Sequence, residues 1–134
     1  MAASFRLDGR RAIVTGASRG LGAAMARALA DAGADVAGVA TGDLAPTGSE
    51  VRDRGRRFVA IAEDLADPGA PSRIVARTVE ALGGVDILVN NAGIIRRADA
   101  LDFTPEDWDD VLDVNLKAAF FLAQAVARGF VAQG

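Results

Sequence analysis

At 134 residues, the chain has the size of one domain with a hydrophobic core of its own. Hydrophobic residues make up 51% and charged residues 25%, and the net charge of -3 offers no basic surface for nucleic acid or an anionic membrane. The lack of Cys and His excludes disulfides, thiolate catalysis and histidine general-base catalysis. No apolar segment opens the chain and no apolar run has membrane-spanning length, so we expect a cytoplasmic chain with no metal site and no membrane partner.

Apolar runs of strand length alternate with helical segments along the chain. Residues 11–15 predict a first buried strand, and the Ala-rich stretch 21–32 predicts a helix that ends at Gly33. The alternation continues with strands at 35–41, 57–62 and 85–90 and with helices at 44–54 and 71–82. Thr104 and Pro105 are typical of a helix start, and a further apolar helix covers about 114–132.

This alternation predicts the fold class. Strand–helix repeats at the spacing of βαβ units give an open parallel sheet with helices on both faces, because parallel crossovers are right-handed. We therefore expect an α/β fold of three layers, a Rossmann-type doubly wound parallel sheet of about four strands followed by a long helix. Ligands of such sheets bind outside the carboxyl ends of the strands, where the candidate segments below lie.

A glycine-rich turn, TGASRGLG from Thr15 to Gly22, follows the first predicted strand. Glycine permits backbone angles that other residues avoid, and it leaves room for a phosphate or for close helix–strand contact. The N–H groups of the turn and of the helix start suit a diphosphate. Taken alone, the turn is equally compatible with a plain connection into an Ala-rich helix. The candidate cofactor-binding residues here are Gly16, Ser18, Arg19, Gly20, Leu21 and Gly22.

The other strand ends also carry polar or small residues. After the third strand, Asp64 is placed to accept a hydrogen bond from an adenine amino group while the Leu65 N–H faces a ring nitrogen; capping of the next turn by Asp64 is the alternative. After the fourth strand, two amides and two small residues leave room for a flat ligand. Asn115 lies in an apolar helix and needs partners, either as a satisfied amide or within a site. The candidates after the second and fourth strands are Thr41, Asp43, Asn90, Asn91, Ala92 and Gly93.

These segments together resemble the short-chain dehydrogenase/reductase family. The resemblance rests on the Gly-rich turn, on Asp64-Leu65, on the Asn90 to Gly93 stretch and on Asn115, and it covers nearly the whole chain. It implies NAD(P)-dependent hydride transfer to or from a carbonyl or alcohol carbon. It also implies that Asp64 holds the adenine, that the Asn90 to Gly93 stretch supports sheet and cofactor, and that Asn115 is a catalytic residue anchoring a proton relay.

Two further stretches, 93–100 and 103–111, are similar to one branch of that family, the 2-deoxy-D-gluconate 3-dehydrogenase group. This similarity implies a sugar-acid substrate such as 2-deoxy-D-gluconate or 2-keto-3-deoxygluconate. Arg96 and Arg97 are candidates to bind its carboxylate, because arginine binds carboxylates through two parallel hydrogen bonds. The alternative is that they are solvated loop residues or pair with Asp99, Asp102 or Asp110. Another short-chain carbonyl reductase is the alternative function.

Cofactor choice depends on the end of the second strand and on the Gly-rich turn. Where NAD-preferring relatives carry an acid, the chain has Ala40, and Asp43 follows three residues later. Arg19 is suited to a 2′-phosphate, as in NADP-preferring relatives. The sugar-acid branch implies NAD, so NAD is the expected cofactor and NADP the alternative.

The family's catalytic Ser and Tyr-x-x-x-Lys cannot be mapped, because the chain contains no Tyr and Lys117 lies too close to Asn115. We therefore expect residues 1–134 to be the N-terminal, cofactor-binding half of a Rossmann-fold dehydrogenase domain and inactive alone. The alternative is an inactive nucleotide-binding module or remnant. The resemblance implies a homo-oligomer, a dimer or tetramer, for the full-length enzyme. An open fourth-strand edge and an apolar last helix predict marginal folding or self-association of the isolated chain.

Overall fold

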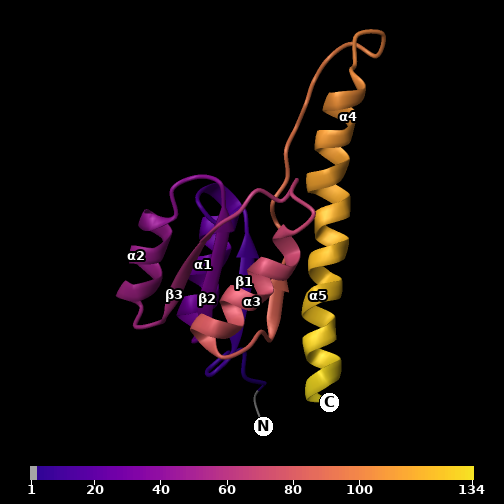
Figure 1. The fold of residues 1–134 in the computed structure, drawn as a ribbon. Helices are drawn as coiled ribbons and strands as arrows, with labels where there is room; N and C mark the ends of the chain where they lie inside the picture. Colours follow the sequence, from indigo (N-terminus) through magenta and orange to yellow (C-terminus); the bar gives the residue numbers. More distant parts are fainter. Residues whose placement is uncertain (1–2) are drawn as a thin grey trace.

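Strands and helices alternate from Arg11 to Gln133 in the computed structural model, which describes residues 3–134 (Figure 1). The helix C-caps at Gly33 and Gly83 have positive φ, as their positions after apolar helices predict. The elements are β1 (Arg11–Thr15), α1 (Gly20–Ala32), β2 (Asp35–Ala40), α2 (Ala45–Asp53), β3 (Phe58–Ala62), α3 (Ala70–Leu82), β4 (Ile87–Val89), α4 (Pro105–Leu112), the π-helix η1 (Asp113–Lys117) and α5 (Ala118–Gln133).

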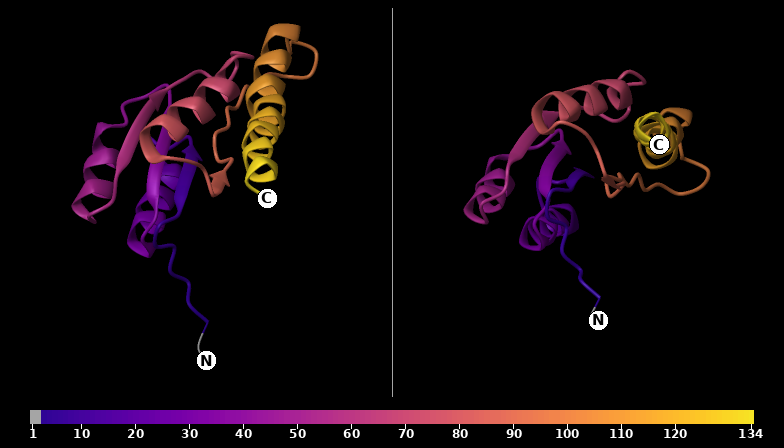
Figure 2. Two further views of the ribbon diagram at one scale, coloured as in Figure 1. Left: turned by 60° about the horizontal axis from the view of Figure 1, so that its bottom comes forward. Right: turned by 90° about the horizontal axis from the view of Figure 1, so that it is seen from below.

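The four strands form one parallel sheet in the order β3-β2-β1-β4. Successive residues of β1 point to opposite faces, so Ile13 and Val14 belong to two different cores. Helices α3 and α5 cover the Ile13 face, and α1 and α2 cover the Val14 face (Figure 2). The predicted three-layer doubly wound fold is therefore confirmed. The strand order reverses between β1 and β4, and this point locates the site described below.

Two elements differ from the sequence-based expectation. The fourth strand is shorter than residues 85–90, because only Ile87–Val89 pair with β1. Just before it, the Asp86 N–H donates to the Arg11 carbonyl, and the Asp86 carboxylate accepts hydrogen bonds from the N–H and Nε of Arg11. The two expected last helices are one continuous helix, Pro105–Gln133, with no break between them. Thr104 caps it as predicted, its hydroxyl accepting from the Asp107 N–H at 3.1 Å. Its first turns, α4, extend beyond the sheet (Figure 1).

The merged helix corrects a second expectation. At 29 residues, with a mean hydropathy of 1.2 in its most apolar window, it is long and apolar enough to cross a membrane, so the expectation that no segment has this length is wrong. The core helix of a globular protein passes the same test. Here Leu122 and Val126 are buried against the sheet, whereas Leu116, Phe120 and Phe130 are exposed. The helix therefore has one face in the core and one apolar face in the open.

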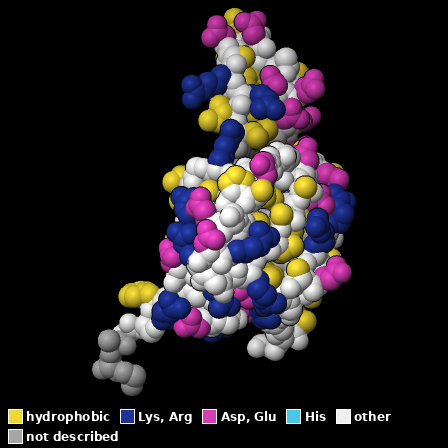
Figure 3. All heavy atoms as spheres, turned by 90° about the vertical axis from the view of Figure 1, so that its left-hand side faces the viewer, with side chains coloured by type: hydrophobic (Ala, Val, Ile, Leu, Met, Phe, Trp, Pro, Cys, Tyr) yellow, Lys and Arg dark blue, Asp and Glu magenta, His cyan; other side chains and the backbone are white. Residues whose placement is uncertain are grey.

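Surface charges are mixed where the chain can be seen from the side of α2. Arginine side chains alternate there with Asp and Glu side chains (Figure 3). Ion pairs link α1 to the α2 region: Arg27 pairs with Glu50, and Arg54 with Asp31. This face therefore presents no continuous patch of one sign.

Candidate functional site

The turn between β1 and α1 brings backbone closer to backbone than any side chain would allow. Gly16 has a φ of +66°, in the left-handed region that favours glycine. A Cβ on Gly22 would overlap the carbonyl oxygen of Gly16 and lie 2.6 Å from the Asn91 Nδ2 atom. The first turn of α1 can therefore sit against the end of β1 only because residue 22 has no side chain.

The N-terminus of α1 has no cap from any side chain of residues 3–134. Its N-cap residue is Arg19, which cannot accept a hydrogen bond, and no acid lies in the first turn. The first N–H groups of a helix lack partners within the helix and carry partial positive charge. The start of α1 is thus suited to an anion supplied from outside the chain.

A network around Thr15 ties the ends of β1 and β4 together. Its hydroxyl, almost fully buried, accepts from the N–H groups of Asn91 at 3.0 Å and Ala92 at 2.9 Å. The Asn91 side-chain amide donates to the carbonyl oxygens of Thr15 at 3.1 Å and Gly16 at 3.4 Å. Asn90 donates to the Ala119 carbonyl of α5. Asn91 therefore connects the loop after β4 to the end of β1, whereas Ala92 and Gly93 line the cavity described next.

These loops surround a cavity of about 620 Å³ at the carboxyl edge of the sheet. The size is within the range of small-molecule and cofactor sites. Most of the sequence-predicted residues meet here, although they come from four separate loops. The lining consists of Gly16, Ser18, Arg19, Gly20, Leu21, Gly22, Val39, Ala40, Thr41, Glu63, Asp64, Leu65, Ala66, Asn91, Ala92, Gly93, Ile94, Arg96, Asp110 and Val114.

Two predicted acids are engaged in turns. Asp43 does not line the cavity; its carboxylate accepts from the Ala45 N–H at 2.9 Å and so begins α2. Asp64 lines the cavity, but one of its oxygens accepts from the Ala66 N–H at 2.9 Å, which is the turn-capping alternative. Its other oxygen remains available to a ligand: within residues 3–134 it accepts no hydrogen bond.

The residues after Gly93 are fastened to the long helix. Asn115 lies on the π-helical turn η1, outside the cavity lining, and its amide bonds the backbone of Ile94 twice, donating to the carbonyl at 2.9 Å and accepting from the N–H at 2.8 Å. Arg96 lines the cavity and pairs loosely with Asp107 at 3.7 Å and Asp110 at 3.9 Å. Arg97 is exposed and outside the lining.

Replacing Asn115 by alanine is expected to free the Ile94 amide, so that its hydrogen exchange in NMR spectra becomes faster. The free energy of unfolding should fall by only about 1 kcal/mol, because the two lost hydrogen bonds lie at an exposed position. Asn115→Asp keeps the acceptor and should keep the Ile94 amide protected. Equal exchange rates in Asn115→Ala and the unsubstituted chain would show that the pair does not hold the loop.

Glu63 is a site residue that the sequence did not reveal, and Arg73 is its partner outside the cavity lining. Glu63 lines the cavity, and its carboxylate receives two hydrogen bonds from Arg73 of α3, at 2.7 and 2.9 Å. These bonds hold the pKa of Glu63 below its ordinary value, against the opposing effect of burial. Glu63 therefore carries a negative charge at neutral pH that Arg73 balances. The one available signal was the position of Glu63 directly before Asp64.

The arrangement fits a dinucleotide. The uncapped helix start next to the Gly-rich turn suits a diphosphate, and the small residues Ala92 and Gly93 leave room for a flat ring. Asp64 and Leu65 also line the cavity, and they carry a carboxylate oxygen and a backbone N–H that accept no hydrogen bond from, and donate none to, residues 3–134. These are a complementary acceptor and donor for a base such as adenine.

The comparisons with known proteins agree with this fit. The family model described as short chain dehydrogenase matches residues 10–134. A curated relative, 2-dehydro-3-deoxy-D-gluconate 5-dehydrogenase of Dickeya dadantii, is 46% identical over 131 residues, which are 98% of this chain and 52% of the relative. The chain thus spans about half the length of the curated relatives it matches.

Solved structures of similar fold hold a nicotinamide dinucleotide. A candidate 2-deoxy-D-gluconate 3-dehydrogenase from Agrobacterium tumefaciens, with bound NADP, is 46% identical with a TM-score of 0.88, covering 98% of this chain and 52% of that one. A short chain dehydrogenase from Mycobacterium paratuberculosis, bound to NAD, is 34% identical with a TM-score of 0.88, covering 96% of this chain and 53% of that one.

Proposed function

Because the chain belongs to the short-chain dehydrogenase family, we propose that residues 1–134 are the cofactor-binding half of an NAD(P)-dependent oxidoreductase that acts on a sugar acid. The reaction would interconvert a hydroxyl and a keto group, as on 2-deoxy-D-gluconate or 2-keto-3-deoxygluconate. The observation that carries the proposal is the uncapped start of α1, held against the Gly-rich turn by Gly22 at the mouth of the cavity. A bound dinucleotide supplies the hydride acceptor or donor.

In this proposal each loop has a distinct role. The Gly16 to Gly22 turn holds the diphosphate through backbone N–H groups, and Asp64 and Leu65 meet the adenine. Ala92 and Gly93 line the cavity next to this turn and leave room for a flat ring. Asn115 acts through Ile94, since both ends of its amide are used there, and it therefore positions the loop that leads to the substrate side.

Arg96 is the proposed contact for the sugar-acid carboxylate. It lines the cavity, and its pairs with Asp107 and Asp110 are long, so a carboxylate with better geometry can replace them. Arg97 lies outside the lining, which makes it the weaker candidate. The names of the curated relatives support a sugar acid as the substrate class.

The proton donor is proposed to come from outside these 134 residues, because the sequence contains no Tyr. Relatives are about twice as long as the matched region, which leaves room for it. We expect the chain to bind dinucleotide but not to turn over 2-deoxy-D-gluconate or 2-keto-3-deoxygluconate in an absorbance assay at 340 nm. Turnover by the chain alone would contradict this division. The alternative is an inactive nucleotide-binding module. It also predicts that the chain binds dinucleotide without turnover, but it predicts no activity when the second half of a relative is added.

The cofactor preference is expected to depend on Arg19. Arg19 lines the cavity and has no ion-pair partner among residues 3–134, whereas Asp43 is turned away toward α2. The sequence favoured NAD, but this placement favours the 2′-phosphate of NADP. NADPH should bind more tightly than NADH. Arg19→Ala should lower the affinity for NADPH about tenfold and leave the affinity for NADH nearly unchanged. Calorimetric titration measures both affinities.

Arg97→Ala is the matched control, since it removes an arginine outside the cavity lining and should change neither affinity. Equal losses of NADH and NADPH affinity in Arg19→Ala would contradict a role in phosphate recognition. If the wild-type chain instead binds NADH more tightly, NAD is the cofactor, as the sequence favoured.

We also propose that the full enzyme is a cytoplasmic homo-oligomer. The exposed apolar side chains of the long helix, Leu116, Phe120 and Phe130, support an interface there, because apolar patches of this kind mark protein contacts. For the chain of 134 residues, size-exclusion chromatography is expected to show self-association. A compact monomer with a cooperative thermal transition would count against it.

A further inference from the structure

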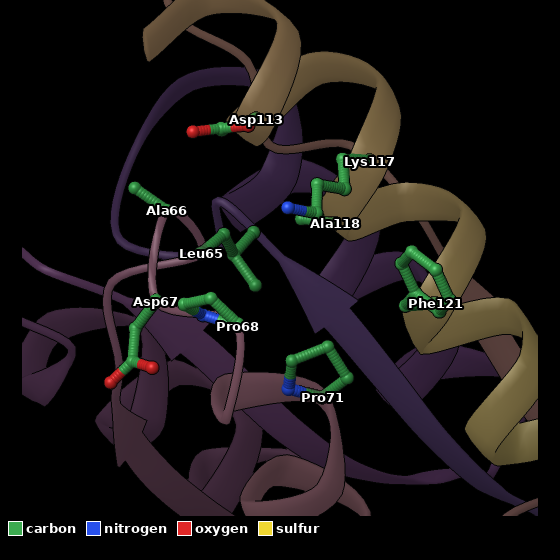
Figure 4. Close-up of a pocket in the computed structure, with 9 residues that line it drawn as sticks. All are labelled: Leu65, Ala66, Asp67, Pro68, Pro71, Asp113, Lys117, Ala118 and Phe121. Carbon is green, nitrogen blue, oxygen red and sulfur yellow. The ribbon is translucent and has the colours of Figure 1, made fainter. Parts of the chain in front are cut away.

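The loop between β3 and α3, residues 63–69, stands between two hollow spaces. On one side lies the large cavity, and on the other lies an apolar cavity of about 230 Å³ between this loop and the long helix. Leu65 and Ala66 line both. Figure 4 shows Leu65 of the loop and Pro71 of α3 on one side of the smaller cavity, and Lys117 and Phe121 of the long helix on the other. At Leu65 and Ala66 the loop therefore separates the two cavities.

Asp64, Asp67 and Pro68 of this loop are exposed, so close packing alone does not fix its position. Leu65 does pack at the edge of the core, but Ala66 and Asp67 border open space. Hydrogen bonds therefore help to fix the loop, among them those from the Glu63 N–H to the Ala40 carbonyl and from the Asp67 N–H to the Asp64 carbonyl.

Arg73 adds side-chain contacts at both ends of the loop. Its guanidinium binds Glu63, the first loop residue, through two hydrogen bonds, and Asp67 through a third at 2.7 Å. Asp67 in turn accepts from the Gly69 N–H at 2.8 Å. The segment that contains Asp64 and Leu65 is enclosed between these two anchored acids.

An exposed ion pair contributes little to stability, and half of this cluster is exposed: the side chains of Arg73 and Asp67 are 47% and 50% accessible. The Glu63 carboxylate is different, because it is only 12% accessible and is bound through two parallel bonds. Arg73 is therefore expected to affect the shape and charge of the cavity wall more than the stability of the fold.

We propose that Arg73 is a positioning residue for the adenine end of the dinucleotide. It holds the 63–69 loop so that the free oxygen of Asp64 and the N–H of Leu65 face the base, and it neutralises the charge of Glu63 at the wall. The inference rests on the proposed function, since it assigns a residue to the same cofactor site. Arg73 itself does not line the cavity.

The test compares NADH and NADPH with their hypoxanthine analogues, which lack the adenine amino group that Asp64 would accept from. The wild-type chain should bind the adenine form more tightly. Arg73→Ala should lower the affinity for the adenine form about tenfold and remove most of the difference between the two bases. The reason is that a displaced loop no longer holds Asp64 next to the base. Arg73→Lys keeps the charge but not the two parallel bonds, and its affinity for the adenine form should lie between those of wild type and Arg73→Ala.

Arg77→Ala is the matched control: Arg77 lies one turn further along α3 and, within residues 3–134, bonds only the Ala60 carbonyl. A thermal transition checks that each variant folds. If Arg73→Ala does not fold, Glu63→Gln and Arg73→Lys must still reduce the discrimination for the proposal to stand. Unchanged affinity and discrimination in folded Arg73 variants, or equal wild-type binding of both bases, would overturn it. A wild-type chain that binds no dinucleotide would overturn the proposed function as well.

Discussion

Replacing Gly22 by alanine is expected to abolish dinucleotide binding and to lower the free energy of unfolding by about 3 kcal/mol. The added methyl group would overlap the backbone carbonyl oxygen of Gly16, which cannot rotate away as a side chain would. The start of α1 would move off the end of β1 and take the diphosphate-binding N–H groups with it. Urea denaturation and calorimetric titration with NADPH measure the two effects.

Gly129→Ala is the matched control, because both residues lie in helices but a Cβ on Gly129 meets nothing within 4 Å. It should leave binding unchanged and stabilise the chain by up to about 1 kcal/mol through helix propensity. Gly22→Ala with unchanged NADPH affinity would show that the Gly-rich turn is only a structural connection.

Replacing Asp35 by alanine is expected to cost about 2 to 3 kcal/mol of stability without touching the cavity. Asp35 is 3% exposed at the start of β2 and accepts from the guanidinium groups of Arg56 and Arg57 and from the Arg57 N–H, all near 2.9 Å. Its removal leaves these donors without their shared acceptor. The expected loss is smaller than for a fully buried ion pair, because the two arginines are partly exposed. Urea denaturation of the purified variant measures the loss.

The same carboxylate predicts a dependence of stability on pH. Burial raises the pKa of Asp35, but hydrogen bonds from Arg57 and Arg56 lower it further, so the pKa in the folded chain is below the ordinary value. Its contribution is therefore present above about pH 3.9 and is lost as the pH falls below that value toward the folded pKa. Asp35→Ala should therefore lose less stability than wild type as the pH is lowered below about 3.9. Parallel losses would contradict this assignment.

Much of the fold and the location of the site could be predicted from local sequence. Strand-length apolar runs and Gly C-caps such as Gly33 depend on neighbouring residues, and the rule that ligands bind at carboxyl ends of parallel strands then locates the site. The length of β4 could not be predicted, because it depends on pairing with β1, which is far away in the sequence. The merging of the last two helices depends on the π turn around Asn115.

Side-chain partners were harder to predict than positions. Asp64 and Arg96 line the cavity as expected, yet each also serves a local contact, to Ala66 and to the acids of α4. Asp43 and Arg97 fall outside the lining. Arg73 follows no motif, and its importance arises from a loop that bends back over the start of α3. Such contacts depend on the three-dimensional path of the chain.

The central claim is that these residues form a dinucleotide site. Calorimetric titration of the purified chain with NADPH and NADH tests it most directly, with ADP-ribose as competitor and a thermal transition to confirm folding. We expect saturable binding at one site, tighter for NADPH, that ADP-ribose displaces. A folded chain that binds neither dinucleotide would contradict the claim.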